Sequence, residues 1–233
     1  MPRKNGSYCR KGSLGLIDTA SKFAPPTTEI PMKLFYAPGA CSLSPHIILQ
    51  ESGLKHTIAK TNLKDKTIDD GGDFKLKNPH GYVPVLELDD GTTLTEGPAI
   101  VQYIADKVPE KKLAPAAGTL DRVKMQGWLN FVSTEIHKGF SPLFNAAMPE
   151  EAKKLFREKL LQRFEVLDRH FGKSEYLMGN SFSLPDAYLF TVLNWTKPTN
   201  IDISHFKNLT AYHARMGARP AVQAAMKAEG LIK

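Results

Sequence analysis

One cysteine, Cys41, stands between a loop with the sequence Ala-Pro-Gly-Ala and a segment, residues 42–51, whose pattern predicts a helix. At the start of a helix, free backbone N–H groups and the positive end of the helix dipole would face the sulfur. Such surroundings favour the thiolate, which is the nucleophilic form of cysteine. A small buried side chain without a chemical role is the alternative, and position alone does not decide between the two.

The sequence lacks the partner that a dithiol mechanism would need. Cys41 is followed by Ser-Leu-Ser, so the spacing excludes a C-x-x-C motif, and disulfide chemistry would require a thiol from outside the chain. The other cysteine is Cys9, and two cysteines are too few for a disulfide framework or a multi-cysteine zinc site. We therefore expect that the protein binds no metal. We also expect it in a reducing compartment, the cytoplasm.

Three further positions could hold an anionic group or a peptide backbone. Pro84 cannot donate to a sheet, so it predicts a strand edge or a tight turn where the Val83 N–H and C=O are free for a ligand. Glu96 and Gly97 open an expected helix, whose backbone donors could hold a carboxylate while Glu96 attracts an amine. Lys66 lies in a loop and could pair with an anion. Taken singly, these positions are better explained as an edge proline, a helix cap and a solvated lysine.

Polar side chains follow one side of a helix that we expect to begin near Leu120. Another side carries Trp128, Val132 and Ile136 at a spacing of four residues, which predicts a face packed in the core. The polar set recurs at helical spacing and suggests the wall of a cleft. A solvent-facing side is the alternative, and a lone histidine is more often structural. The polar set is Asn130, Thr134, His137 and Lys138.

The elements that must position these residues begin with a mixture of strand and helix patterns. Their order is β-α-β, then a β-hairpin signalled by Asp-Asp-Gly at residues 89–91, then a helix that opens at Glu96. This order predicts a mixed sheet with helices packed on it, in an α+β or α/β domain. We expect strands at 33–36, 57–63, 83–88 and 92–95, and the first helix at 42–51, ended by Gly53.

The chain divides into four parts. Residues 1–31 combine scattered charge with Gly, Ser and a Pro-Pro pair, and we expect a mostly disordered N-terminal extension. Residues 32–112 form the α/β domain, 113–118 a linker, and 119–233 a domain with helical periods only. Ser183 and Asp186 have the spacing of a capping box. The helices of this second domain are expected near 120–141, 150–171, 183–195, 207–217 and 220–228.

Composition excludes several classes of protein. The 233 residues are 42% hydrophobic and 24% charged, as in an ordinary globular protein, and no apolar run is long enough to cross a membrane. The net charge is +7, but the chain has no arginine run with interleaved aromatic residues that would indicate a nucleic-acid site. We therefore expect a soluble protein that binds neither nucleic acid nor membranes. A small anionic ligand is compatible with its charge.

Five separated blocks of sequence carry a resemblance to a known family. They begin at Met32, Asn78, Leu94, Trp128 and Asp186, and they are MKLFYAPGACSLSPH, NPHGYVPV, LTEGPAIVQY, WLNF with EIHKGF, and DAYLF. In order and spacing they resemble the bacterial beta-class glutathione S-transferases over about residues 32–233. The resemblance implies a thioredoxin-like N-terminal domain, an all-helical C-terminal domain, a homodimer, and glutathione as cosubstrate. The extension has no counterpart in the family pattern.

The resemblance also implies roles for residues of the first domain. Cys41 would lie beside the glutathione sulfur. The Val83 backbone would pair with the cysteinyl group of glutathione, ahead of a cis Pro84. Glu96 and Gly97 would hold the γ-glutamyl end of the tripeptide.

The remaining implied site residues come from a loop and from the helical domain. Lys66 resembles the lysine that meets the glycyl carboxylate of glutathione. Thr134 stands where the family often has Ser, and its hydroxyl preserves the capacity for a hydrogen bond. The residues that would close the site from the helical domain are Asn130, the segment Thr134, Glu135, Ile136 and His137, and Lys138.

The leading hypothesis is a conjugation reaction in detoxification or stress defence. The glutathione thiolate, stabilised by helix N-terminal donors, the Cys41 region and His137, would attack a hydrophobic electrophile, which makes Cys41 and His137 the expected catalytic residues. A first alternative is a glutathione-dependent thiol-disulfide reductase that acts through a mixed disulfide on Cys41. A second alternative is a non-catalytic carrier of glutathione or of a hydrophobic ligand.

Overall fold

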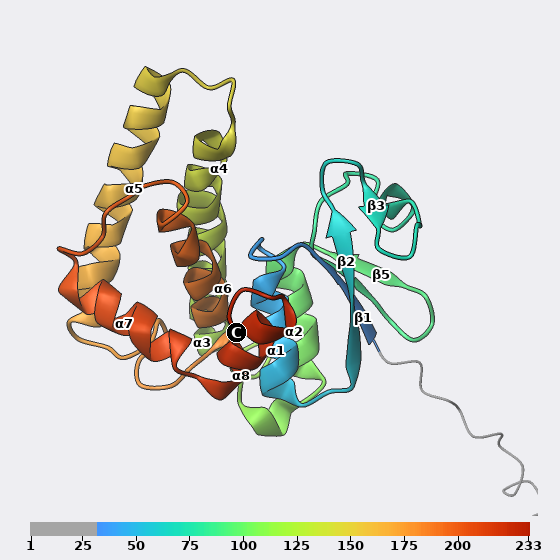
Figure 1. Ribbon diagram of the computed structural model, residues 1–233. Coiled ribbons are helices and arrows are strands. Elements are labelled where there is room, and N and C mark those ends of the chain that lie inside the picture. Colours follow the sequence, from blue (N-terminus) through green and yellow to red (C-terminus); the bar gives the residue numbers. More distant parts are fainter. Residues whose placement is uncertain (1–31) are drawn as a thin grey trace, which may run out of the picture.

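The computed structural model describes residues 32–233, so Cys9 and the extension that we expect to be disordered lie outside the described residues. Figure 1 shows a small mixed sheet with two helices against it, beside a larger group of helices. A short 3-10 turn, Pro109–Lys111, lies between the last helix of the first group and the first helix of the second. The described helices include none that is long and apolar enough to span a membrane.

The sheet has five strands in the order β3-β2-β1-β4-β5. Strand β1 runs parallel to β2 because helix α1 carries the chain back between them, with Met32 opposite His56. Strands β4 and β5 form the predicted antiparallel hairpin, so the predicted mixed sheet with packed helices is confirmed. The elements are β1 Met32–Tyr36, α1 Leu43–Ser52, β2 His56–Asn62, β3 Thr67–Ile68, β4 Val85–Glu87, β5 Thr93–Thr95 and α2 Gly97–Asp106.

One strand boundary differs from the sequence prediction, one strand is additional, and the end of the first helix agrees with it. Strand β4 begins at Val85 and not at residue 83, because Pro84 has no N–H to give to the sheet. Strand β3 is an additional element whose two residues are too few to show an alternating pattern. Helix α1 ends as predicted at Gly53, whose φ of 72° suits a left-handed C-cap.

The second part of the chain is entirely helical. The expected continuous helix over residues 120–141 is interrupted, because residues 132–137 form a π-helical turn with an i→i+5 hydrogen-bond pattern. Compared with a regular α-helix, this turn changes the direction in which the side chains within it and after it point. The elements are α3 Leu120–Phe131, the π turn Val132–His137, α4 Lys138–Phe144, α5 Glu150–Phe171, α6 Leu184–Leu193, the 3-10 turn Asn194–Thr196, α7 Lys207–Gly217 and α8 Pro220–Ala228.

Helix α6 forms the centre of the helical part. All ten of its residues are buried, and it packs against α1, α3 and α7. The Asp186 carboxylate closes its N-terminus by accepting hydrogen bonds from the Leu177 N–H at 2.8 Å, the Ser183 N–H at 2.9 Å and the Ser183 hydroxyl at 2.8 Å. The predicted capping box is therefore confirmed.

The last helix, α8, joins the helical part to the sheet domain. It packs against α1, as Figure 1 shows with the red helix beside the blue one. Just beyond α8, Glu229 accepts from His46 Nδ1 of α1 at 2.9 Å, and both side chains are fully buried. Removing one partner of a buried pair strongly destabilises a protein, because the other partner is left buried without its counterpart. This contact therefore fixes the position of α8 on the sheet domain.

Candidate active site

A cavity of about 1330 Å³ opens between the loop after β1 and the helical part. Its walls come from segments that are far apart in the sequence and that differ in character. The thiol of Cys41 lies near the Val83 carbonyl and the charges of Glu96 and Lys138, and we call this part of the lining the polar end. Phe144 and Trp195 pack together elsewhere in the lining, and we call that part the apolar end. The polar end includes Cys41, Lys66, Val83, Glu96, Gly97, His137 and Lys138, and the apolar end includes Phe144, Trp195, Met226 and Leu231.

The Cys41 thiol donates a hydrogen bond to the Val83 carbonyl oxygen at 3.2 Å. Burial raises the pKa of the thiol to about 11, and the negative charge of Glu96 adds to the increase, while backbone N–H groups and Lys138 act against it. Backbone N–H groups at the start of the helix lower the pKa, as expected, but burial outweighs them and leaves the thiol form favoured. Desolvation disfavours the anion more than the helix N-terminus favours it.

The loop that carries Cys41 is held from the helical part at a single residue, Gly39. Its carbonyl oxygen accepts from the indole N–H of Trp195 at 2.8 Å. Its N–H donates at 3.0 Å to Glu229, whose other carboxylate oxygen accepts from His46. Gly39 has a φ of 69°, a conformation that glycine adopts without strain. The position of the cysteine therefore depends on groups more than 150 residues away.

Two backbone positions of the sheet domain lie at the polar end of the cavity. The peptide bond between Val83 and Pro84 is cis, as the family resemblance implies, and the Val83 carbonyl faces the Cys41 thiol. Glu96 precedes helix α2 with a φ of 65°, in the left-handed region that is unfavourable for a residue with a side chain. Gly97 and Pro98 begin helix α2. Because proline has no N–H, and because the Ala99 and Ile100 N–H groups donate to the Glu96 carbonyl oxygen, the Gly97 N–H is the backbone donor that this turn leaves for the cavity.

Lys66 brings a positive charge to the same region from the loop between β2 and β3. Its backbone also has a positive φ, 59°, and its ammonium group donates to the Gly81 carbonyl oxygen at 2.9 Å. The ammonium group lies 5.7 Å from the centre of the Tyr82 ring. These contacts fix Lys66 at the cavity wall, where it can pair with an anionic group of a ligand.

The π turn brings His137 into the cavity and leaves the three residues before it outside. The exposed Thr134 donates to the Asn130 carbonyl oxygen at 3.0 Å, and Glu135 pairs with Arg163 of α5 at 2.7 Å. Ile136 is fully buried in the core. Within the segment 134–137, only the His137 side chain lines the cavity. Thr134 was expected there because uninterrupted helical spacing aligns it with Asn130 and Lys138.

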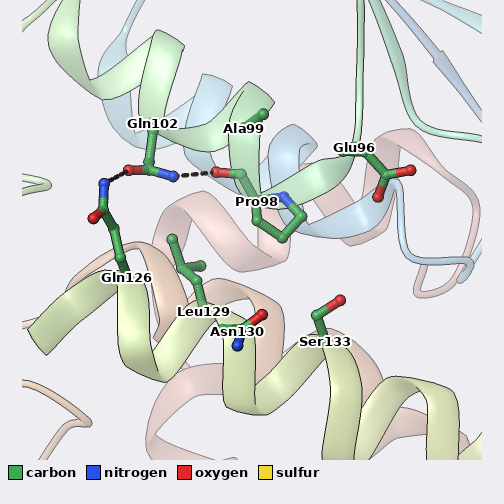
Figure 2. Close-up of a pocket in the computed structure, with 8 residues that line it drawn as sticks. All are labelled: Glu96, Pro98, Ala99, Gln102, Gln126, Leu129, Asn130 and Ser133. Carbon is green, nitrogen blue, oxygen red and sulfur yellow. Dashed lines mark hydrogen bonds between the residues drawn. The ribbon is translucent and has the colours of Figure 1, made fainter. Parts of the chain in front are cut away.

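Ser133 takes the place in the cavity wall that Thr134 was expected to occupy. It also lines a smaller groove of about 370 Å³ between α2 and α3, where Asn130 lies. Figure 2 shows Asn130 and Ser133 of the α3 side facing the start of α2. The Gln126 amide donates at 2.9 Å to the Gln102 side chain, which in turn donates to the Pro98 carbonyl. No sequence signal identifies Ser133, because its facing depends on the π turn.

His137 is a neutral imidazole in this structure. Burial lowers its pKa to about 4, with a further contribution from the positive charge of Lys138. Its Nδ1 atom lies 2.5 Å from the hydroxyl oxygen of Tyr188, a residue of α6 that the sequence analysis did not identify as part of the site. At pH 7 the ring therefore carries one N–H, which can donate to an anion, and no positive charge.

An aromatic wall lines the apolar end of the cavity. Trp195 meets the His137 ring edge to face at 4.8 Å between centroids, and Phe144 packs on the other part of the indole at 5.7 Å. Phe144 is 53% exposed, so it presents an apolar ring to whatever enters the cavity. Met226 and Leu231 from the C-terminal segment complete this end. The cavity can thus hold a polar molecule beside an apolar one.

The described part of the chain offers no cluster of three or more His, Cys, Asp and Glu side chains that could bind a metal ion. The groups in the cavity are hydrogen-bond donors and acceptors, one thiol and charged side chains at the rim. Such groups can bind an anionic peptide and stabilise a developing or fixed negative charge on sulfur.

Comparison with known proteins identifies the class that the fold and the cavity define. Residues 39–107 match the family described as Glutathione S-transferase, N-terminal domain, and residues 131–220 match the one described as Glutathione S-transferase, C-terminal domain. Over 200 residues the chain is 44% identical to Glutathione S-transferase GstA of Escherichia coli O157:H7. This alignment covers 86% of the chain and 100% of the relative.

Two solved bacterial structures have the same fold. A sphingomonad glutathione S-transferase complexed with glutathione is 45% identical, with a TM-score of 0.83. The beta-class glutathione S-transferase of Sphingomonas chungbukensis is also 45% identical, with a TM-score of 0.84. Each match covers 86% of this chain and 100% of the other. The chain therefore belongs to the glutathione S-transferase family, and its thioredoxin-like domain followed by a helical domain is the fold of that family.

Proposed function

We propose that this protein conjugates the thiolate of glutathione to hydrophobic electrophiles. The observation that carries the proposal is the arrangement of one cavity, in which the polar end holds Cys41, Val83 and Glu96 and the adjoining end is aromatic. A polar thiol peptide and an apolar second substrate would lie side by side in such a cavity. The family name and the glutathione bound to the sphingomonad relative support the choice of peptide.

The charges around the cavity match the ends of the tripeptide. Glu96 and Gly97 would hold the γ-glutamyl group, because the Glu96 carboxylate attracts its amine and the Gly97 N–H can donate a hydrogen bond to its carboxylate. Lys66 would pair with the glycyl carboxylate. The Val83 backbone would pair with the cysteinyl residue between them. This arrangement directs the sulfur of glutathione towards Cys41 and His137.

The reaction that we propose needs a stabilised thiolate and a carbon that it can attack. Glutathione loses its thiol proton to solvent, its sulfur forms a bond to the electrophilic carbon, and the leaving group departs with its electron pair. The neutral His137 ring can donate a hydrogen bond to the thiolate, and the Cys41 thiol can do so once it turns from the Val83 carbonyl oxygen, its acceptor in the structure. Lys138 adds a positive charge at the cavity rim, which favours the anion further.

The raised pKa of Cys41 bears on the reductase alternative. A mixed disulfide on Cys41 forms by attack of its thiolate on a disulfide, and a pKa of about 11 leaves little thiolate at neutral pH. We therefore assign Cys41 to hydrogen bonding with the glutathione sulfur and not to a redox cycle. The carrier alternative is likewise not favoured, because donors for a thiolate lie directly beside the apolar end of the cavity.

The test is conjugation of glutathione to chlorodinitrobenzene, an activated aryl halide, by the wild type and by Cys41→Ala. We expect turnover by the wild type and a several-fold lower rate in the variant, because one of the two donors is lost. No turnover with several electrophiles, despite glutathione binding, would contradict the proposal and favour a carrier. If Cys41→Ala loses all activity, Cys41 takes a more direct part in the conjugation step than donating one hydrogen bond.

Three further features belong to the same proposal. We propose a role in detoxification or stress defence, because an aromatic, open cavity accepts many electrophiles. We propose a location in the cytoplasm, because glutathione must be reduced to react and the chain has only two cysteines. We propose a homodimer, because helix α3 exposes Leu120 and Val123 beside the groove that it forms with α2.

A further inference from the structure

Helix α6 places one hydroxyl group against the imidazole of His137. The Tyr188 oxygen lies 2.5 Å from His137 Nδ1, and the two rings are perpendicular, with centroids 5.8 Å apart. Tyr188 is only 5% exposed, yet it lines the same cavity as Cys41. A short hydrogen bond between the buried Tyr188 of α6 and the partly buried His137 of the π turn fixes the orientation of the imidazole.

The protonation of both rings determines the direction of this hydrogen bond. Burial, together with the charge of an ionised Cys41, raises the pKa of Tyr188 well above its ordinary value, so the side chain remains a phenol. His137 is neutral at pH 7 because burial lowers its pKa. A phenol is a good donor, and the unprotonated nitrogen of a neutral imidazole is a good acceptor. The Tyr188 O–H can therefore donate to Nδ1, and in that arrangement the imidazole proton lies on Nε2.

A second aromatic ring also contacts the imidazole. The Trp195 ring meets it at an angle of 75°, and the indole N–H of Trp195 donates to the Gly39 carbonyl in the loop that carries Cys41. The imidazole is thus fixed relative to that loop from two directions. Because Tyr188 occupies Nδ1, Nε2 is the nitrogen that remains for a ligand in the cavity.

We propose that Tyr188 is a positioning residue, which holds His137 in the Nε2–H tautomer so that the ring donates a hydrogen bond to the glutathione sulfur. That the acceptor of this hydrogen bond is glutathione rests on the proposed function. Without the phenol hydroxyl, the Nδ1–H tautomer becomes accessible, and Nε2 would then present a lone pair to the thiolate. The hydroxyl of Tyr188 thereby favours the anionic form of glutathione without touching it.

The first test reads the tautomer directly by ¹⁵N NMR of the His137 ring in the full-length protein. Tyr188→Phe removes only the hydroxyl, and Tyr176→Phe is the matched control, because the Tyr176 hydroxyl accepts from Arg219 at 3.4 Å outside the cavity. We expect the Nε2–H tautomer in the wild type and in Tyr176→Phe, and a shift towards Nδ1–H in Tyr188→Phe. An unchanged tautomer in Tyr188→Phe overturns the proposal, provided that its melting temperature shows a folded protein.

The second test measures the ionisation and the reaction of bound glutathione. In Tyr188→Phe we expect the pKa of the bound glutathione thiol to rise by about one unit and the rate at neutral pH to fall about tenfold. The KM for glutathione should stay within about twofold, because the ends of the tripeptide are held elsewhere. The double variant with His137→Ala should be no slower than His137→Ala alone, since Tyr188 acts through that ring.

The two tests separate this proposal from the proposed function. Additive losses in the double variant would mean that Tyr188 acts independently of His137, and they would overturn its role as a positioning residue. If the wild type conjugates no electrophile while the tautomer still changes in Tyr188→Phe, the proposed reaction fails and the positioning of His137 by Tyr188 is supported.

Discussion

Burial governs the chemistry of Cys41 more than its position before a helix does. Helix α1 begins at Leu43, and Cys41 turns its thiol towards the Val83 carbonyl oxygen, which accepts a hydrogen bond from it. Backbone donors near the helix start lower the pKa, but desolvation and the charge of Glu96 raise it to about 11. At this scale, a functional residue can be located from its sequence position, whereas its protonation depends on the atoms around it.

We predict that Cys41 in the ligand-free protein reacts slowly with iodoacetamide. A thiol whose pKa is raised from its ordinary range to about 11 stays protonated until the pH approaches that value, so its reactivity grows as the pH rises. At pH 8 the rate should be roughly a hundredfold lower than for free glutathione. Cys9→Ala leaves Cys41 as the only cysteine for this measurement. A rate equal to that of glutathione at pH 8 would contradict the raised pKa.

Two elements of the helical part decide how the cavity is built. Because of the π turn at residues 132–137, Ser133 lines the cavity where regular helical spacing predicts Thr134, and His137 lies beside Tyr188. Helix α6 supplies Tyr188 from a position where every neighbouring residue is buried. The start of α6 therefore has to be fixed, and the Asp186 carboxylate fixes it by accepting three hydrogen bonds.

We predict that Asp186→Ala lowers the free energy of unfolding by about 3 kcal/mol, because it leaves buried donors of Leu177 and Ser183 without an acceptor. Urea unfolding at neutral pH measures this loss. The matched control is Asp202→Ala, which removes a carboxylate that accepts from the Ser204 N–H at 2.8 Å on the exposed surface. A loss no larger in Asp186→Ala than in Asp202→Ala would mean that the capping box does not hold α6 in place.

At the scale of the whole molecule, two surfaces matter: the contact between the sheet domain and the C-terminal segment, and an exposed face that a second copy of the chain could cover. One is internal, where Glu229 beyond α8 joins His46 to the loop of Cys41 through Gly39. The other is external: helix α3, which lines one wall of the groove in Figure 2, exposes the apolar residues Leu120 and Val123. A closed symmetric dimer would cover such a face with the same face of a second copy.

We predict that the protein has twice the mass of one chain in solution, and that Val123→Glu converts it into a monomer. Val123 is 59% exposed on α3, and a buried carboxylate at a symmetric interface would meet its own copy or lose its hydration. Leu155→Glu is the control, because Leu155 is 66% exposed on α5. Light scattering after gel filtration measures the mass. A wild type with the mass of one chain would contradict the proposed dimer.

The sequence by itself determined the order of the elements and most of the residues at the polar end of the cavity. Gly53, the Asp-Asp-Gly turn and the pair Ser183 and Asp186 act on neighbouring backbone groups, so their effects can be inferred from local sequence. The family blocks placed Cys41 and His137 in one cavity, and the structure has both in its wall.

Only the tertiary structure decided the protonation and the facing of these groups. Ser133, Tyr188 and Trp195 enter the cavity because a π turn shifts one helix and because α6 packs beside it. The pKa of Cys41 rises and that of His137 falls because chain segments distant in sequence exclude water from both side chains. Desolvation is a sum over all surrounding atoms, and a pattern of neighbouring residues along the chain carries no measure of that sum.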